Sequence, residues 1–319
     1  MPGDTKERVA IIGAGVSGLT CAVRFAERGF PTTIFAREAG QQTTSAVAAA
    51  IWFPYDAEPI EQVAAWSLRS FDVLQEIARD VTSGVAIVEL RAFARQGVIE
   101  LPDWAVSLGA RRLEQSEIKQ DIFTSGYAVH VPVVDTTIYL DYLTTRARLA
   151  GAVFNPPAEL ASLHELNREH TLIINCSGAG ARTLAGDTEI EPHRGQVAVV
   201  AKLDLPYAIV CDDPPLMYAI PRRHDCVLGG TNEVSENAEP SPDDTARILT
   251  EAARVLGIDP PPVVKERVGL RPFRRSGIRL EREQLADGRT VIHNYGHGGS
   301  GFTLAWGCAE AVFALRDAG

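Results

Sequence analysis

The stretch "RVAIIGAGVSGLTCAVRFAERGFPTTIFARE", residues 8–38, alternates in the way that a βαβ unit should. Its residues 9–12 form a continuous apolar run, as expected for a strand that is buried on both faces. Across residues 17–28 the apolar side chains recur at helical spacing, and Gly29 supplies a stop signal. Residues 32–36 are apolar enough for a second buried strand. The stretch therefore predicts the first unit of a parallel sheet.

The motif "GAGVSG" joins the first strand to the helix, which is the setting of a dinucleotide-binding fingerprint. In that fingerprint the glycines allow a tight turn, a close approach of the pyrophosphate and close helix–strand packing, while the helix N-terminus offers free N–H groups. Glu38 lies twenty residues after Gly18, where a carboxylate can accept ribose hydroxyls. Glycines that serve only a tight turn are the alternative. The motif predicts an ADP-containing cofactor, bound by Gly13, Ala14, Gly15, Val16, Ser17, Gly18, Arg37 and Glu38.

Three further segments favour FAD over NAD. The segment "NCSGAGAR", 175–182, ends another buried strand with small residues that include Ser177 and Gly178. In "QQTTSAVAAAIWFPY", 41–55, hydroxyls suited to pyrophosphate oxygens precede alanines small enough to lie along a ring, although an ordinary alanine-rich core segment has the same pattern. Five glycines in "HNYGHGGSGFTLAWG", 293–307, offer a close-approach surface far along the chain, and a second fingerprint for NAD is absent. The residues expected to contact FAD in the second segment are Thr43, Thr44, Ser45, Ala49, Ala50 and Ile51.

The rest of the chain predicts a discontinuous two-domain arrangement of the α/β class (α+β overall). Helical patterns cover 60–80, 135–150 and 241–256, a buried strand covers 171–178, and strand-rich sequence covers 84–134 and 193–234. Three strand–glycine–helix features lie in separate thirds of the chain, with antiparallel-looking sequence between them. We therefore expect a Rossmann-like FAD-binding domain from 1–55, 135–190 and 265–319, and a substrate domain on a largely antiparallel sheet from 56–134 and 191–264.

Composition excludes several classes of partner. A chain of 319 residues that is 45% hydrophobic can bury a large core, and its net charge of −10 argues against nucleic acid or an anionic membrane surface. Five widely spaced cysteines without a C-x-x-C pair predict no metal site and no disulfide framework, so a cytoplasmic location is expected. No signal peptide, membrane-spanning run or peroxisomal address is recognisable. The oligomeric state is not readable, and a homodimer stays open.

Several of these motifs together resemble the D-amino-acid oxidase family, the branch of FAD-dependent amine oxidases that includes the D-aspartate oxidases. The resemblance extends over nearly the whole chain. The segments that carry it are "VAIIGAGVSGL", "TTSAVAAAIWFPY", "PHRGQ" (192–196), "GLRPFRRSGIRLERE" (269–283) and "VIHNYGHGGSGFTLAWGCA" (291–309).

The resemblance implies roles for individual residues. Arg271 is similar to the arginine that grips the substrate α-carboxylate, Tyr218 to the tyrosine whose hydroxyl joins it, and Gly299 to the glycine whose carbonyl receives the substrate amine. A guanidinium fork matches a carboxylate, although an arginine-rich strand is more often a solvated face. Arg279 resembles an arginine near the flavin ring, and Ser300 belongs to the same site. The loop implied to lie along the ring comprises Gly298, Gly299, Ser300, Gly301, Phe302 and Thr303.

The reaction implied by the resemblance is oxidative deamination of a D-amino acid. A hydride moves from the substrate to flavin N5, water hydrolyses the imino acid to a 2-oxo acid and ammonia, and O2 reoxidises the flavin to give hydrogen peroxide. The final helix should begin near Gly301, where its N-terminus can stabilise negative charge on the reduced ring. His297 could be a general base, but a structural role is favoured because the chemistry requires no base.

Specificity is less well determined by the sequence. In "GGTNE", Asn232 occupies the place where D-aspartate oxidases tend to have an arginine, so neutral D-amino acids are expected, while Arg222 and Arg223 keep a D-aspartate oxidase open. The segment "CDDPPLMYAIP", 211–221, is short and lacks a second tyrosine, which predicts an open entrance without a lid. Glycine and other amine oxidases, a quinone-linked dehydrogenase and a non-catalytic flavin-binding scaffold are the alternatives.

Overall fold

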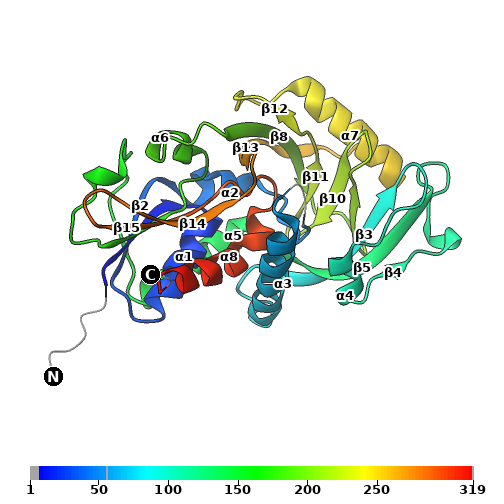
Figure 1. Cartoon of the computed structure of the whole chain (residues 1–319). Coiled ribbons are helices and arrows are strands. Elements are labelled where there is room, and N and C mark those ends of the chain that lie inside the picture. The colour runs from blue at the N-terminus through cyan, green and yellow to red at the C-terminus, as the bar shows by residue number, and fades with distance from the viewer. Residues whose placement is uncertain (1–6, 55–56, 318–319) are drawn as a thin grey trace.

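Two β-sheets form the framework of the protein, and a computed structural model describes it over residues 7–54 and 57–317 (Figure 1). The first sheet has six strands in the order β14-β15-β7-β1-β2-β6, all parallel except for β14, which runs antiparallel to β15. Its central strands are apolar and buried on both faces, as expected for a parallel sheet. The bounds are β1 Val9–Ala14, β2 Thr32–Ala39, β6 Val153–Phe154, β7 Leu172–Asn175, β14 Arg279–Gln284 and β15 Thr290–Tyr295.

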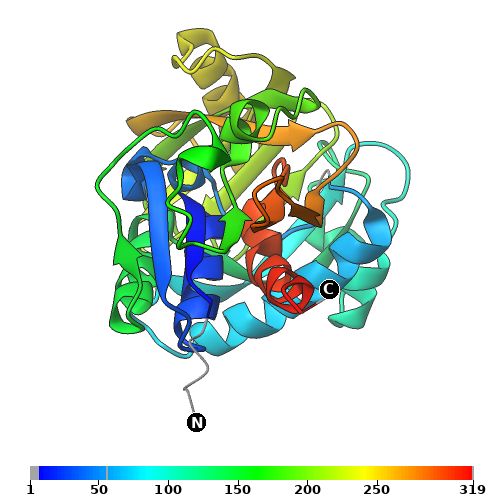
Figure 2. The same ribbon diagram turned by 60° about the vertical axis from the view of Figure 1, so that its left-hand side comes forward.

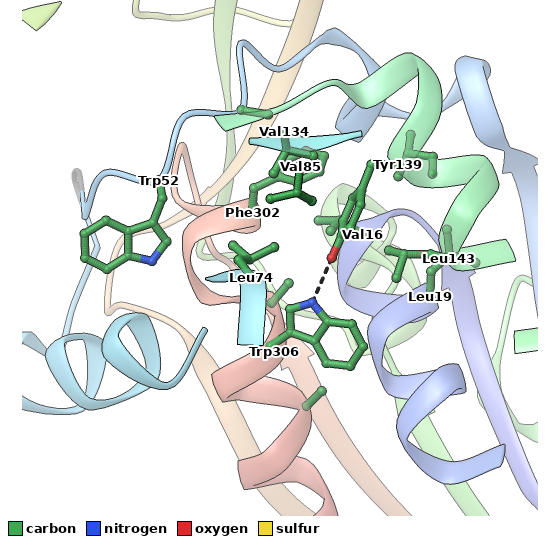
Figure 3. Packing of buried hydrophobic residues seen from close by; sticks show 14 of the residues in the cluster. Val16, Leu19, Trp52, Leu74, Val85, Val134, Tyr139, Leu143, Phe302 and Trp306 are labelled. Atoms are coloured by element: carbon green, nitrogen blue, oxygen red, sulfur yellow. Dashed lines mark hydrogen bonds between the residues drawn. The ribbon is translucent and has the colours of Figure 1, made fainter. Parts of the chain in front are cut away.

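Helices α1 (Val16–Ala26), α5 (Thr136–Leu149) and α8 (Gly301–Leu315) pack together beside this sheet. Asp135 caps the N-terminus of α5, because the Thr137 amide donates to Asp135 Oδ1 at 3.0 Å. Figure 3 shows the apolar core between these helices, where Trp306 Nε1 donates to the Tyr139 hydroxyl at 2.8 Å.

The second sheet has nine strands and is largely antiparallel, as predicted. The strand order is β12-β8-β11-β10-β9-β3-β5-β4, and β13 pairs with β8 outside this order. Among the described strands of this second sheet, only β3 and β9 pair in parallel. The bounds are β3 Val85–Ala94, β4 Arg111–Arg112, β5 Ser125–Val134, β8 Ile190–Ala201, β9 Ala208–Cys211, β10 Met217–Pro221, β11 Asp225–Gly229, β12 Glu233–Val234 and β13 Val263–Arg274.

The remaining helices connect or cover the sheets. Helix α3 packs on α8, and α7 covers part of the antiparallel sheet, beginning at Pro242 with the Ser241 hydroxyl accepting from the Asp244 amide at 3.3 Å. No helix within residues 7–54 and 57–317 is both long and apolar enough to cross a bilayer. The bounds are α2 Thr44–Val47, α3 Ile60–Ile77, α4 Asp103–Ser107, α6 Ala181–Leu184 and α7 Pro242–Leu256, with 3₁₀ turns η1 Gly40–Gln42, η2 Gln115–Glu117, η3 Leu163–Glu165 and η4 Gly178–Gly180.

The six-stranded sheet takes its strands from early, middle and late parts of the chain, as expected of a discontinuous cofactor domain. Figure 2 brings this sheet forward and shows its blue and green segments near the red helix α8. Residues 265–274, which we placed with the cofactor domain, belong to β13 and therefore to the nine-stranded sheet, because β13 pairs with β8 along its length. The division into two domains itself stays a prediction.

Candidate active site

A cavity of about 720 Å³ lies between the two sheets, where the carboxyl ends of the parallel strands face the antiparallel sheet. In open α/β sheets ligands bind at this end of the strands. Parts of both sheets line it, from the Gly13 turn after β1 to Arg271 on β13. Most of the residues predicted from separate motifs are therefore brought together in one space.

The fingerprint glycines have the packing that the motif requires. Gly13 has a φ of +102°, and a Cβ there would overlap the carbonyl of Cys176 on the neighbouring strand end. A Cβ on Gly18 would overlap the Gly13 carbonyl, so Gly18 packs α1 onto the strand without lining the cavity itself. A Cβ on Gly15 would approach the Ser45 hydroxyl to 3.0 Å. The turn between β1 and α1 is therefore a cradle with bare backbone.

The hydroxyl segment that follows β2 completes this cradle. Thr43, Thr44 and Ser45 all line the cavity, and the Ser45 Oγ accepts from the Val16 amide at the start of α1 at 3.0 Å. The Ala46 carbonyl behind them is held by the Thr136 hydroxyl, 2.9 Å away. The segment is fixed against α1 and α5, with hydroxyls at the place expected for phosphate oxygens.

Glu38 and Arg37 line the end of the cavity expected for the ribose. Arg37 pairs with Glu38 at 3.2 Å and with Glu159 at 2.9 Å. The segment 158–161, which carries Glu159, also lines the cavity and was missed by the sequence interpretation. Its place depends on a backbone bond from Ala158 to Ala36 at 3.2 Å, for which the local sequence holds no signal.

The alanine segment lies along the cavity as predicted, and one of its residues has an unusual backbone. Ala50 has a φ of +56°, a conformation that costs a non-glycine residue on the order of 1 kcal/mol and that clusters at functional sites. The Val134 amide holds the Ala50 carbonyl at 2.9 Å, and Ile51 forms a bridge with Val133. Strand β5 therefore fixes this segment against the cavity.

The glycine loop before α8 is tied directly to strand β13. The Gly298 amide donates to the Pro272 carbonyl at 3.0 Å, and His297 forms a β-bridge with Phe273. Gly299 and Arg271 both line the cavity, as do Gly298, Gly301, Phe302 and Thr303. Helix α8 begins at Gly301 as predicted. Gly299 and Arg271 are 28 residues apart in the sequence, but these backbone contacts bring them to the same wall of the cavity.

Arg271 and Tyr218 form a paired anchor in this cavity. Arg271 donates to the Thr231 carbonyl at 3.0 Å and to Asn232 Oδ1 at 3.3 Å. Burial raises the pKa of Tyr218, while the charge of Arg271 and a hydrogen bond with it act in the opposite direction. The Tyr218 phenol therefore stays protonated at neutral pH and remains a hydrogen-bond donor.

Three glycines in or directly after neighbouring strands make room for this anchor, and the sequence interpretation gave them no role. A Cβ on Gly195 would overlap the Arg271 guanidinium, and a Cβ on Gly229 or Gly230 would press on the Tyr218 ring. Glycine inside a strand often marks such a close approach. This rule could have identified the three positions from the sequence, because "PHRGQ" and "GGTNE" both carry glycines within strand-rich sequence.

His297 lines the cavity as a neutral side chain. Burial lowers its pKa to about 4, and its Nε2 lies 3.1 Å from the Asn294 amide oxygen. Nε2 therefore carries the proton and donates it to Asn294. This geometry fits the structural role that we favoured for His297.

Three predicted residues do not line the cavity: Gly18, Ser300 and Arg279. Ser300 belongs to the glycine loop but is fully buried. The guanidinium of Arg279 is held by Glu281 at 2.6 Å, Glu283 at 3.1 Å and the Tyr295 hydroxyl at 2.8 Å, and its expected position near the ring stays a prediction. Tyr295 itself lines the cavity, so Arg279 lies behind it.

The chain matches the family model described as FAD dependent oxidoreductase over residues 8–315. The chain belongs to this family of FAD-dependent oxidoreductases. A D-amino-acid oxidase of Rubrobacter xylanophilus is 41% identical over 100% of this chain and 98% of that protein. A human D-aspartate oxidase is 34% identical over 97% of this chain and 96% of that protein. Glycine oxidase from Bacillus cereus has the same fold, with a TM-score of 0.83 at 19% identity, covering 98% of this chain and 95% of that one.

As a member of this family the chain is an oxidoreductase with FAD as its cofactor, and the cavity fits that group. A Cβ at Gly15 would approach the Ser45 hydroxyl, which accepts from the Val16 amide, so only bare backbone leaves this turn open. The long path from Glu38 past the alanine segment to Gly299 suits an extended dinucleotide better than a small ligand. The fold class and the cofactor predicted from the sequence are confirmed.

Proposed function

We propose that this oxidoreductase is a D-amino-acid oxidase, which converts D-amino acids with non-acidic side chains, O2 and water into 2-oxo acids, ammonia and hydrogen peroxide. One observation carries the proposal: Arg271 and Tyr218 line the same cavity as the Gly298–Gly299 loop and the FAD cradle. A guanidinium and a phenol suit the acid end of an amino acid, and a backbone carbonyl suits its amine.

Two anchors would orient the substrate. Arg271, assisted by the Tyr218 hydroxyl, binds the α-carboxylate, and the Gly299 carbonyl accepts a hydrogen bond from the amine. With both ends of the amino acid fixed, only one of the two enantiomers presents its α-hydrogen to the part of the cavity that the alanine segment lines. Bound FAD supplies the two-electron acceptor, which O2 reoxidises. His297 holds its proton on Nε2 against Asn294 and takes none from the substrate.

Acidic substrates are disfavoured by the charges around the cavity. Arg222, which kept a D-aspartate oxidase open, is buried in a pair with Asp225 at 2.7 Å. Arg223 donates to the Val81 carbonyl at 2.9 Å, and neither arginine lines the cavity. Arg271 is thus committed to the α-carboxylate, and a second carboxylate would lie unpaired.

Truncation of Arg271 tests the proposal. Leaving a substrate carboxylate unpaired in a desolvated site costs about 3–5 kcal/mol, so kcat/KM for D-alanine should fall by about two to four decades in Arg271→Ala. The yellow FAD spectrum should be retained, because the cradle lies elsewhere. Arg275→Ala is the matched control, since Arg275 is exposed and pairs with Glu191 outside the cavity. Full activity in Arg271→Ala would reject the assignment.

A reaction with the wild-type enzyme tests the stereochemistry. Under nitrogen, D-alanine should bleach the flavin and L-alanine should leave it yellow, and peroxide should appear once air is admitted. Bleaching without peroxide would favour the quinone-linked dehydrogenase. No bleaching by any D-amino acid would leave the non-catalytic scaffold.

A cytoplasmic location and partners limited to small molecules belong to the same proposal. All five cysteines are buried free thiols, which suits a reducing compartment. The net charge of −10 suits neither nucleic acid nor an anionic membrane surface. A homodimer stays a prediction for which solution scattering or ultracentrifugation is the measurement.

A further inference from the structure

One carboxylate lines the active-site cavity without a role in the chemistry above. Asp212 directly follows strand β9, whose Val210 lies opposite Tyr218 on β10. Because alternate residues of a strand point to the same face, Asp212 shares the face of Val210 and Tyr218. Strand spacing and rise place the Asp212 Cα about 8 Å from the Tyr218 Cα, on the side away from Arg271.

The space between the anchor and Asp212 is apolar. Val210 lines the cavity beside Tyr218, and the β9–β10 register continues to Leu216 and Asp212, which lie opposite each other and also line it. A substrate held by Arg271 and Tyr218 can therefore extend its side chain over Val210 to a place where an aliphatic residue and a carboxylate lie side by side. That sequence of surfaces matches the aliphatic stem and charged tip of a lysine or arginine side chain.

The Asp212 carboxylate has no partner of opposite charge in the described part of the chain. Its neighbour Asp213 is engaged, because the Arg95 amide donates to Asp213 Oδ2 at 2.7 Å. Desolvation by the surrounding protein, followed by the negative charge of Asp213, raises the pKa of Asp212 to about 6. Asp212 is nevertheless ionised above neutral pH, and its charge contributes to the raised pKa of buried Tyr127 on β5. An unpaired negative charge thus faces the distal end of the cavity.

We propose that Asp212 is a specificity-determining residue, which selects D-amino acids whose side chain ends in a cation and is long enough to reach it, such as D-arginine and D-lysine. The inference rests on the proposed D-amino-acid oxidase activity and refines its substrate class. The same charge acts against acidic side chains. Shorter neutral substrates do not reach Asp212 and are handled by the anchor alone.

Matched pairs of substrates test the inference with the holoenzyme at pH 8. D-Arginine is compared with D-citrulline, which has the same length without the charge, and D-lysine with D-norleucine. Because Asp212 is exposed to the cavity, solvent weakens the attraction, and we expect kcat/KM to favour each cation by about fivefold or more. Asp212→Asn should bring both ratios close to one while leaving D-norleucine oxidation within about threefold.

Asp213→Asn is the control, because it removes the same charge from the next residue, which does not line the cavity. It should preserve the preference for cations. Wild-type ratios at or below one would overturn the inference without any variant, and so would ratios that Asp212→Asn leaves unchanged. In either case, oxidation of D-norleucine would show that the proposed D-amino-acid oxidase activity stands. If no D-amino acid were oxidised at all, the proposed function itself would be rejected.

Discussion

The absence of a methyl group at Gly229 determines where the Tyr218 ring can lie. Gly229 faces Tyr218 across the β10–β11 pair, and a Cβ there would enter the ring. Gly195 has the same relation to the Arg271 guanidinium. The positions of both side chains of the proposed anchor therefore depend on glycines in neighbouring strands.

Gly229→Ala should lower activity without loss of the fold. The added methyl group displaces the phenol by about 1 Å, and a misplacement of that size costs up to about a hundredfold in rate. We expect kcat/KM for D-alanine to fall by about ten- to a hundredfold, with the FAD spectrum retained.

A double-mutant cycle with Tyr218→Leu is the control for this prediction. Once the ring is gone, the Gly229→Ala change should add little, because the atoms with which it collides are absent. Additive effects in the cycle would mean that Gly229 acts through something other than Tyr218.

Residues that belong to a recognisable motif could be predicted from the sequence, whereas glycines that only leave room for another side chain could not. Arg271, Tyr218 and Gly299 came from motifs and meet in one cavity. Gly195 passed unnoticed because its partner is a side chain 76 residues away. The partners of Arg279 were not predictable either, because a motif gives the position of a backbone, whereas the acceptors that hold its guanidinium lie on β14 and β15.

Among the elements, α8 shows how a glycine can position two helices. Gly307 lies in the middle of α8, its amide donates to the Ser70 hydroxyl of α3 at 2.8 Å, and a Cβ there would overlap the Trp66 backbone. The N-terminus of the same helix lines the active-site cavity. The contact between α3 and α8 therefore fixes the end of α8 that faces the cofactor site.

Gly307→Ala should destabilise the protein although alanine is the better helix former. Propensity favours alanine by about 1 kcal/mol, but forcing the two helices apart costs about 1–3 kcal/mol or more. We expect a net loss of about 1–2 kcal/mol in the free energy of unfolding, measured by urea titration with saturating FAD.

Ala314→Gly on the exposed side of α8 is the reference for propensity alone, with an expected loss of about 1 kcal/mol. A Gly307→Ala variant more stable than the wild type would show that α3 and α8 are not in close contact.

Local sequence patterns predicted most helices and strands, but not which strands pair with each other. The helices at 60–77, 136–149 and 242–256 follow from the helical spacing of their apolar residues. The place of β13 does not, because pairing with β8 joins residues up to 84 positions apart and the strand is only half-buried. An amphipathic strand next to a cofactor motif fits either sheet from its sequence alone.

At the scale of the whole molecule, the two sheets meet at Asp187. Its Oδ2 accepts from Arg274 Nε, at the end of β13, at 2.8 Å and from the Tyr295 hydroxyl of β15 at 2.9 Å. Tyr295 lines the cavity, and Arg279 holds the same hydroxyl from behind. This carboxylate therefore links the antiparallel sheet to the parallel sheet beside the cofactor site.

Asp187→Asn should loosen this link in a way that depends on pH. Among the described residues, the variant leaves Arg274 with only Glu189, 3.1 Å away, as an acidic partner, so we expect a loss of about 2–3 kcal/mol in unfolding free energy at pH 7. Burial opposes ionisation of Asp187, but the bonds from Arg274, Glu189 and Tyr295 outweigh it and lower the pKa.

A carboxyl group whose pKa is lower in the folded than in the unfolded state stabilises the fold fully above its unfolded pKa of about 3.9 and loses that contribution as pH falls through the folded pKa. The gap between wild type and Asp187→Asn should thus be the same at pH 7 and pH 5.5 and shrink below about pH 4. Urea midpoints at saturating FAD measure this gap. The control is Asp317→Asn: Asp317 is an exposed partner of Arg316, and we expect this variant within about 0.5 kcal/mol of wild type. Equal midpoints at pH 7, or a gap that widens in acid, would mean that the two sheets are held together elsewhere.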